Sequence, residues 1–298
     1  MPLKLDRGGL SMKKRKVPIT PYLLLVIPLI SVSAFGFYPF IKTIISSFSR
    51  TTEVGSWLGW AGLENWKTVF SDKEFGRVMW NTFKFAGINL VVSLFGAMVF
   101  ALLADGCTRG RRLVQTLYAL PLVIASAPTS LIWRFMFRKE GGIINMALGT
   151  DMAWLQDADT ALIAVAIVTA WSQIALSFIL LLAGFRNVSN DLLEAATLDG
   201  AGAFTKAVRI KIPIASPQIF YVIFLKIISS FKAFGQIRML TEGGPAGATT
   251  TLMYKVYERG TASGYFEWAC CYSIILFIII FVATRIQFMM EKKLVHYQ

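Results

Sequence analysis

The sequence predicts an all-α integral membrane protein with six transmembrane helices. Of its 298 residues 55% are hydrophobic and only 16% are charged, and the mean hydropathy is +0.59. Soluble proteins carry about a quarter charged residues. The apolar residues also fall into runs of about twenty, the helix length that crosses a bilayer core. An ordinary soluble enzyme is therefore excluded.

The first expected span, 17–41, has no charged residue and follows four consecutive basic residues. This pattern is also typical of a cleaved signal peptide, whose apolar region is about 7–15 residues long. Because the run here has 25 residues, we predict a membrane helix. Pro21, Pro28 and Pro39 are expected to kink it without ending it.

Similar apolar runs predict five further spans, at 85–104, 113–133, 161–184, 216–235 and 268–290. The transmembrane domain is then 17–290, between a basic N-terminal segment, 1–16, and a tail, 291–298. An even number of spans places both termini on one side of the membrane.

The distribution of Lys and Arg near the helix ends assigns that side. The pieces on the side of the termini hold sixteen basic residues and six acidic ones, whereas the rest of the chain holds fourteen and eleven. We therefore predict that both termini are cytoplasmic. The formal net charge of +13 is then a topology signal, and no nucleic-acid partner is expected. Six of the tryptophans fall near the outer side, as in an interfacial aromatic belt.

Three cysteines and one histidine, His296, are too few for a disulfide framework or a zinc site. No metal site is expected.

One cytoplasmic connection, the long loop at 185–215, is expected to form its own helices. Asn190 or Asp191 can cap the first helix, and Asp191 with Glu194 resembles a capping box. Gly200 is expected to end this helix.

A second amphipathic stretch follows, and we expect Pro213 to stop it. A helix, a turn and a second helix on the cytoplasmic surface suit docking to another protein.

The sequence of the long loop resembles the EAA signature of permease subunits of ATP-binding-cassette importers. Ile212 stands where that signature usually has Leu before the proline. The residues that match, and that the resemblance assigns to ATPase coupling, are Glu194, Ala195, Ala196, Asp199, Gly200, Ala201 and Pro213.

The resemblance extends over nearly the whole chain. The segments 62–66, 81–82 and 243–252 are similar to the carbohydrate-uptake branch of these permeases. Within that branch, 254–257 and 295–298 are most similar to the first permease of glycerol-3-phosphate importers.

This resemblance implies the type I importer fold and a transport subunit that works by alternating access in a bacterial-type cytoplasmic membrane. The implied partners are two cytoplasmic ATPases, a second and different permease chain, an extracytoplasmic solute-binding protein and membrane lipid. The sequence contains no G-x-x-x-x-G-K-[ST] phosphate loop. ATP and Mg²⁺ are therefore expected on the ATPases, with no cofactor on this chain and no enzymatic activity of its own.

Each residue of the loop also fits a purely structural role. Glu194 can complete a helix cap, the alanines favour helix, and Gly200 is an ordinary helix-ending residue. Their joint occurrence in the one long cytoplasmic loop favours an interface.

The substrate pathway is expected near charged and polar residues inside the spans. Lys226 lies near mid-depth of the fifth span, whereas Lys232 lies near the outer boundary, where it can extend to water. Lys226, Lys232 and Arg238 follow one another at steps of six residues, so a helix points them in three different directions. They cannot line one wall together.

Neutral polar residues within the spans are candidates for sugar recognition: Asn89, Trp171, Ser172 and Gln173. Hydrogen bonding between helices is the alternative role for Asn89. We expect Gln173 and Lys226 to face the cavity.

Two other classes of membrane protein compete with this interpretation. A gradient-driven secondary transporter or channel, acting as a single chain, would need inverted repeats or acidic pairs in the membrane. A membrane enzyme would need clustered catalytic groups. No acidic residue lies in the cores of the six expected spans, and the single histidine is near the end of the chain.

Overall fold

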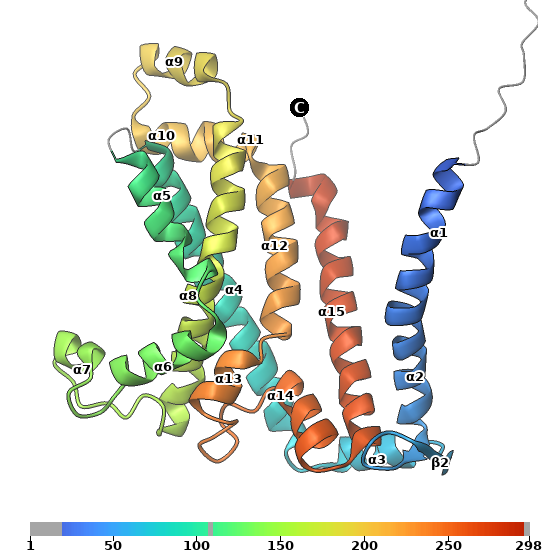
Figure 1. The fold of residues 1–298 in the computed structure, drawn as a ribbon. Helices are drawn as coiled ribbons and strands as arrows, with labels where there is room; N and C mark the ends of the chain where they lie inside the picture. The colour runs from blue at the N-terminus through green and yellow to red at the C-terminus, as the bar shows by residue number, and fades with distance from the viewer. Residues whose placement is uncertain (1–19, 107–109, 295–298) are drawn as a thin grey trace, which may run out of the picture. The chain divides into compact units, whose positions relative to one another are not determined.

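The computed structural model describes residues 20–106 and 110–294, most of which are helical (Figure 1). The chain divides into two compact units, Met1–Thr43 and Ile44–Gln298. Within the described residues five helices are long and apolar enough to cross a membrane, or six if one sharply bent pair counts as a single span. The prediction of an all-α membrane protein is confirmed.

The first unit contains most of the first span. Helix α1 (Thr20–Val32) continues through a π-helical turn (Ser33–Phe37) into α2 (Tyr38–Ser47), which runs on past the end of the unit. The N–H of Tyr38 bonds to the carbonyl of Ser33, five residues back. This wider turn ends one residue before Pro39. A proline in a helix has no N–H to donate and its ring crowds the carbonyl four residues back, and the wider turn relieves that crowding, so the helix continues past the proline.

The second unit holds two short strands and the remaining helices. Its elements, apart from short 3₁₀ and π turns, are β1 (Ser49–Thr51), β2 (Trp57–Trp60), α3 (Glu64–Ser71), α4 (Phe75–Gly106), α5 (Arg111–Ala119), α6 (Ser126–Met136), α7 (Ile143–Leu148), α8 (Ala158–Arg186), α9 (Asn190–Leu198), α10 (Ala203–Lys206), α11 (Ile212–Ile214), α12 (Ser216–Phe231), α13 (Gly235–Leu240), α14 (Leu252–Tyr257) and α15 (Phe266–Leu294). The strands β1 and β2 pair antiparallel.

Helices α4 and α8 form the most extensive contact in this unit. Ala97, Ala101 and Ala104 on one face of α4 are fully buried, and they pack in a cluster with Phe178 and Leu181 of α8. Small side chains let two membrane helices approach closely, and the larger side chains of the neighbour fill the space between them.

The third span is not the straight helix expected at 113–133. It consists of α5 and a 3₁₀ turn, Leu120–Leu122, followed by α6, with a bend of 98° between the two parts. Pro121 lies in the 3₁₀ turn, and Pro128 lies in the first turn of α6. Proline is tolerated at both places because neither needs an intrahelical N–H donor, but the two together break the span.

The fifth span, expected at 216–235, is interrupted: α12 stops at Phe231 and α13 begins at Gly235. The candidate membrane span Ser216–Leu240 includes both helices. The second, fourth and sixth predicted spans lie within α4, α8 and α15.

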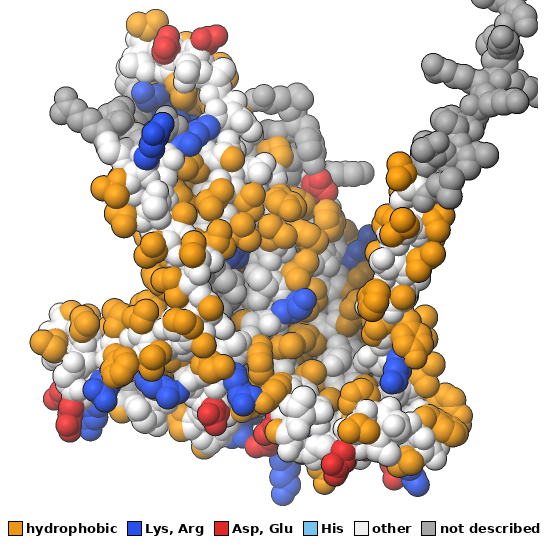
Figure 2. Space-filling model, in the orientation of Figure 1, with side chains coloured by type: hydrophobic (Ala, Val, Ile, Leu, Met, Phe, Trp, Pro, Cys, Tyr) orange, Lys and Arg blue, Asp and Glu red, His pale blue; other side chains and the backbone are white. Residues whose placement is uncertain are grey.

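Helices α9 and α10 lie at one end of the second unit, where α15 also ends (Figure 1). We call this the α9 end, and the end that carries α3, α13 and α14 the opposite end. On the face drawn in Figure 2, hydrophobic side chains cover the middle of this unit, and acidic side chains gather at α9 and at the opposite end. This is the surface expected of a membrane-embedded body.

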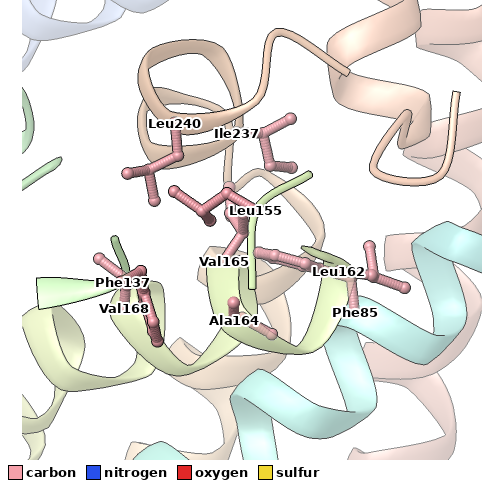
Figure 3. Close-up of a cluster of buried hydrophobic side chains, with 11 residues drawn as sticks. Phe85, Phe137, Leu155, Leu162, Ala164, Val165, Val168, Ile237 and Leu240 are labelled. Atoms are coloured by element: carbon pink, nitrogen blue, oxygen red, sulfur yellow. The ribbon is translucent and has the colours of Figure 1, made fainter. Parts of the chain in front are cut away.

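A buried hydrophobic cluster holds the opposite end together. Phe85 of α4, Val165 and Val168 of α8, and Ile237 and Leu240 of α13 belong to it (Figure 3). The cluster joins α13, which follows the fifth span, to the second and fourth spans.

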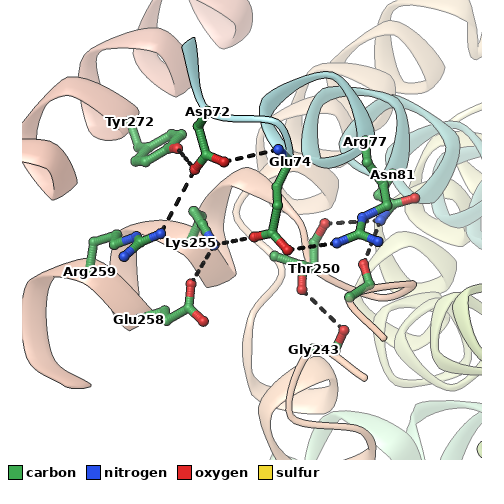
Figure 4. Close-up of polar contacts among 11 residues, drawn as sticks. Asp72, Glu74, Arg77, Asn81, Gly243, Thr250, Lys255, Glu258, Arg259 and Tyr272 are labelled. Atoms are coloured by element: carbon green, nitrogen blue, oxygen red, sulfur yellow. Dashed lines mark hydrogen bonds and ion pairs between the residues drawn. The ribbon is translucent and has the colours of Figure 1, made fainter. Parts of the chain in front are cut away.

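Next to this cluster lies a network of ion pairs and hydrogen bonds (Figure 4). The ammonium of Lys255, a residue that is 2% exposed, lies 2.8 Å from carboxylate oxygens of both Glu74 and Glu258. The side-chain amide of Asn81 donates to the carbonyls of Gly247 (3.1 Å) and Thr250 (3.2 Å). The network ties the start of α4 to the segment around α14.

Candidate functional site

The first candidate site is the long loop, 185–215, which contains α9, α10 and α11. Helix α9 begins at Asn190, and Ser189 is its N-cap without a side-chain hydrogen bond. Neither Asn190 nor Asp191 is therefore the N-cap, and the predicted capping box of Asp191 and Glu194 is also wrong. Because the helix begins before Asp191, this carboxylate lies in the first turn, where a negative charge interacts favourably with the helix dipole.

Gly200 ends α9 in the way the sequence predicts. Its φ is +81°, in the left-handed region. Its N–H bonds to the carbonyl of Thr197 (3.0 Å), and the N–H of Ala201 bonds to the carbonyl of Ala196 (2.8 Å). These two bonds form a Schellman motif, which satisfies carbonyls at the helix end. A Cβ on Gly200 would meet no atom within 4 Å, so only the backbone conformation demands glycine here.

The surface of α9 combines apolar and acidic side chains. Leu198 at its end is 90% exposed. The EAA residues Glu194 and Ala195 and the following Asp199 are exposed, whereas Ala196 is half-buried. An exposed leucine beside carboxylates fits a protein partner with an apolar cleft and a basic rim.

The second half of the loop differs from the prediction that Pro213 stops a helix. Helix α10 continues through a π turn (Ala207–Lys211) into α11, in whose first turn Pro213 lies. The N–H of Ile212 bonds to the carbonyl of Ala207, five residues back. The helix ends only at Ala215. As before Pro39, a π turn ends one residue before the proline.

Ion pairs anchor the loop to the ends of two spans. The Asp105 carboxylate at the end of α4 binds the ammonium of Lys211. The Nε of Arg186, at the end of α8, lies 4.0 Å from the same carboxylate. The side chain of Asp105 is only 11% exposed. Within the loop, Lys206 donates to the hydroxyl of Thr197 (3.1 Å), which joins α10 to α9.

Sequence reasoning did not single out Asp105 as a functional residue. Its signal in the sequence is its position: it is an acidic residue directly after the apolar run 85–104.

The second candidate site surrounds Lys226. This residue is 4% exposed, and its ammonium donates to the backbone carbonyl of Gln173 at 2.6 Å. The side-chain oxygen of Gln173 accepts from Ser229 at 3.2 Å and lies 3.5 Å from the nitrogens of Lys226 and Asn89. No carboxylate within the described residues pairs with Lys226, so its charge is balanced by neutral dipoles alone.

A cavity of about 560 Å³ lies beside this cluster, between α8 and α12. Lys226, Gln173, Ser172 and Ser229 line it, and Lys232 lies at its edge as an exposed residue. Gln173 and Lys226 thus lie beside a cavity, and their contact with substrate stays a prediction. Ser229, one turn after Lys226 on the same helix face, was not predicted.

Two predicted pathway residues do not line this cavity. Asn89 is fully buried and contacts Gln173, as expected for a hydrogen bond between helices. Trp171 packs against Trp133 in an edge-to-face pair, with ring centroids 5.7 Å apart. Arg238 lies on α13, over the ring of Tyr257 at 4.5 Å, so it is also separate from Lys226.

A family model for the binding-protein-dependent transport system inner membrane component matches residues 97–296. The matched region includes α8, the long loop and α12. Both candidate sites, apart from Asn89, lie inside it.

The chain is also similar to a curated protein along nearly its whole length. It is 30% identical over 282 residues to an sn-glycerol-3-phosphate transport system permease protein of Salmonella choleraesuis (strain SC-B67). The alignment covers 93% of this chain and 96% of the relative.

Two solved structures share the fold. A crystal structure of a bacterial ABC transporter for import of the acidic polysaccharide alginate matches with a TM-score of 0.81 and 20% identity, covering 93% of this chain and 96% of that one. A second structure, of a bacterial alginate transporter in complex with an alginate pentasaccharide-bound periplasmic protein, matches with a TM-score of 0.80 and 19% identity, covering 92% and 94%.

Proposed function

Since the chain belongs to the family of binding-protein-dependent transport system inner membrane components, we propose that it imports a hydroxylated solute, glycerol-3-phosphate or an oligosaccharide. It acts as the permease subunit of an ATP-driven importer in the cytoplasmic membrane. The relative's name supports the first solute. A multi-subunit assembly is favoured over a single-chain transporter because of this family membership.

The observation that carries the proposal is the structure of the long loop. It presents α9 as an exposed helix, fixes its end with a Schellman motif at Gly200, and ties its base to α4 and α8 through Asp105. Such an element can receive a push from a partner and pass it to the spans as a rigid-body displacement.

In this proposal α9 docks into a cytoplasmic ATPase, with Glu194, Ala195, Ala196, Asp199, Gly200 and Ala201 as the contact region. ATP and Mg²⁺ bind to two such ATPases. Closure of the ATPases displaces α9, and the ion pairs of Asp105 transmit the displacement to α4 and α8. The cavity near Lys226 then changes its access from one side of the membrane to the other.

The solute path runs through the cavity beside Lys226. Gln173, Ser172 and Ser229 offer neutral hydrogen-bonding groups suited to hydroxyls, and Lys226 offers a positive charge suited to a phosphate. A second, different permease chain would complete the path, and a periplasmic solute-binding protein would deliver the solute at the opposite end. Both chain termini then lie in the cytoplasm, with 17–290 as the membrane domain.

The test is ATP hydrolysis by the purified assembly in lipid, with its solute-binding protein. The solute panel contains glycerol-3-phosphate, a glycerophosphodiester and maltooligosaccharides. We expect one solute class to raise hydrolysis above the level seen with the binding protein alone. The preparation without the ATPase subunits is the control.

Solute uptake by this chain alone in vesicles, without ATPase subunits, would contradict the proposal. A loop that reacts with an impermeant thiol reagent from outside the cell, through a cysteine placed at Leu198, would also contradict it.

A further inference from the structure

A second cavity, of about 520 Å³, lies between α5 and α8 at the α9 end. Its polar lining includes Arg112 at the start of α5, Thr116 one turn further along α5, and Arg186 at the end of α8. Ile179 and Leu182 line it further along α8, toward the middle of the span. The cavity therefore changes from polar to apolar along the direction in which a lipid lies in a bilayer.

The charge around the polar end is positive. Arg112, Arg186 and Lys211 are three cations, and the nearby Asp105 supplies one negative charge. Arg186 faces Asp105 through its Nε, at 4.0 Å.

The start of α5 adds to the positive potential. Helix α5 begins one residue before Arg112, and its N-cap, Gly110, makes no side-chain capping bond. The first backbone N–H groups of a nine-residue helix favour an anion.

We propose that this cavity binds one anionic phospholipid. The headgroup phosphate lies between Arg112 and Arg186, and an acyl chain lies along Ile179 and Leu182. Basic pockets between membrane helices bind anionic headgroups in this way. A phospholipid fits better than free phosphate because only a lipid uses the apolar part of the lining.

The test is native mass spectrometry of the purified full-length chain, delipidated and then given phosphatidylglycerol or phosphatidylcholine with identical acyl chains. We expect preferential retention of one phosphatidylglycerol. Arg112→Ala should weaken its binding about fivefold, the effect of one basic residue near an anionic headgroup. Arg112→Lys, which keeps the charge, should retain most of the binding.

Two variants separate this site from general charge attraction. Arg209 is exposed in the long loop and does not line the cavity, so Arg209→Ala should bind as the unchanged chain does. Ala183 lines the cavity and is exposed, so Ala183→Trp should block lipid binding without a change of charge.

Equal retention of the two lipids, or an equal loss in Arg209→Ala, would overturn the proposal. Unchanged binding in Ala183→Trp, or displacement of the lipid by millimolar inorganic phosphate, would show an anion site and no lipid site. Loss of the lipid from the complete importer would show that a partner subunit covers the cavity, and would also overturn it. None of these results depends on which solute is transported.

Discussion

At the scale of single residues, backbone conformation and buried charge decide what the two candidate sites require. Gly200 and Gly202 both lie in the turn after α9, but only Gly200 has a positive φ; Gly202 has a φ of −69°. Neither position has an atom within 4 Å of an added Cβ. Lys226 differs from both glycines, because the burial of its charged side chain, and not its backbone conformation, limits which residue can replace it.

The two glycines allow a matched test of the loop. Gly200→Val forces a β-branched residue into the left-handed region, at a cost of about 1–3 kcal/mol, and should distort the end of α9. We expect lower solute uptake and weaker retention of the ATPase, with normal membrane insertion. These are measured by transport assay, co-purification and membrane fractionation.

Gly202→Val is the control for this change, because its φ is one that valine adopts readily. It should transport and assemble as the unchanged chain does. Full transport in Gly200→Val would rule out docking through this end of α9.

Lys226 allows a test of substrate charge. Lys226→Met keeps most of the side-chain length and removes the ammonium that donates to Gln173. We expect uptake of a phosphate ester to fall at least tenfold, since a charge-assisted hydrogen bond contributes about 1.5–3 kcal/mol. Uptake of a neutral oligosaccharide by the same importer should change much less.

Lys84→Met serves as the comparison, because Lys84 is an exposed lysine of α4 that does not line the cavity. An equal loss for both solutes in Lys226→Met would assign this lysine to folding and would remove it from the solute path.

At the scale of elements, prolines and ion pairs determine how force can pass from the long loop to the membrane. A π turn that ends one residue before Pro39 and another that ends one residue before Pro213 let a helix continue past a proline. The second keeps α10 and α11 in one continuous helical segment that leads to α12. Asp105 then fixes this segment, through Lys211, to the end of α4.

We expect Asp105→Asn to loosen this connection, because it leaves the partly buried Lys211 without its carboxylate, at a cost of about 1–3 kcal/mol. The number of ATP molecules hydrolysed per solute transported should rise, and amide hydrogen exchange in α10 and α11 should become faster. Both quantities are measured on the reconstituted importer.

Asp105→Glu, which keeps the charge, should restore most of the coupling. Asp151→Asn makes the same change at an exposed position far from the loop in the sequence. It should leave the number of ATP molecules hydrolysed per solute unchanged. An unaltered ratio in Asp105→Asn would show that the loop transmits movement by another contact.

At the scale of the whole molecule, the opposite end depends on paired charges as well as on packing. The buried Lys255 holds two carboxylates, and its contact lowers the pKa of Glu74 from the usual value of 4.5. Because the pKa is lower in the folded chain, Glu74 stabilises the fold above its unfolded pKa. That stability is lost as the pH falls through the folded pKa.

A pH series on Glu74→Gln tests this contribution. We expect the variant to have a lower Tm than the unchanged chain at pH 7, and the difference between them to shrink as the pH falls below about 4.5. Thermal unfolding of the purified chain in detergent measures both.

Glu140→Gln, at an exposed glutamate, provides the reference for loss of one carboxylate. A Tm difference for Glu74→Gln that stays constant between pH 7 and pH 3.5 would contradict the ionic role of this residue.

The sequence by itself determined the class of the protein, the positions of most spans, the long loop and the glycine that ends α9. These features follow from local properties: hydropathy over about twenty residues, helix propensity and the φ that only glycine adopts readily. The same local rules located Gln173 and Lys226 as polar groups inside spans.

Only the tertiary structure decided which of these residues meet. The partners Lys226 and Gln173 are 53 residues apart, and Lys211 and Asp105 are 106 apart. Their contacts depend on how α4, α8 and the fifth span pack, which no local pattern specifies. The 98° bend in the third span also depends on tertiary packing. Its two prolines permit a break, but packing of the parts on either side sets the angle.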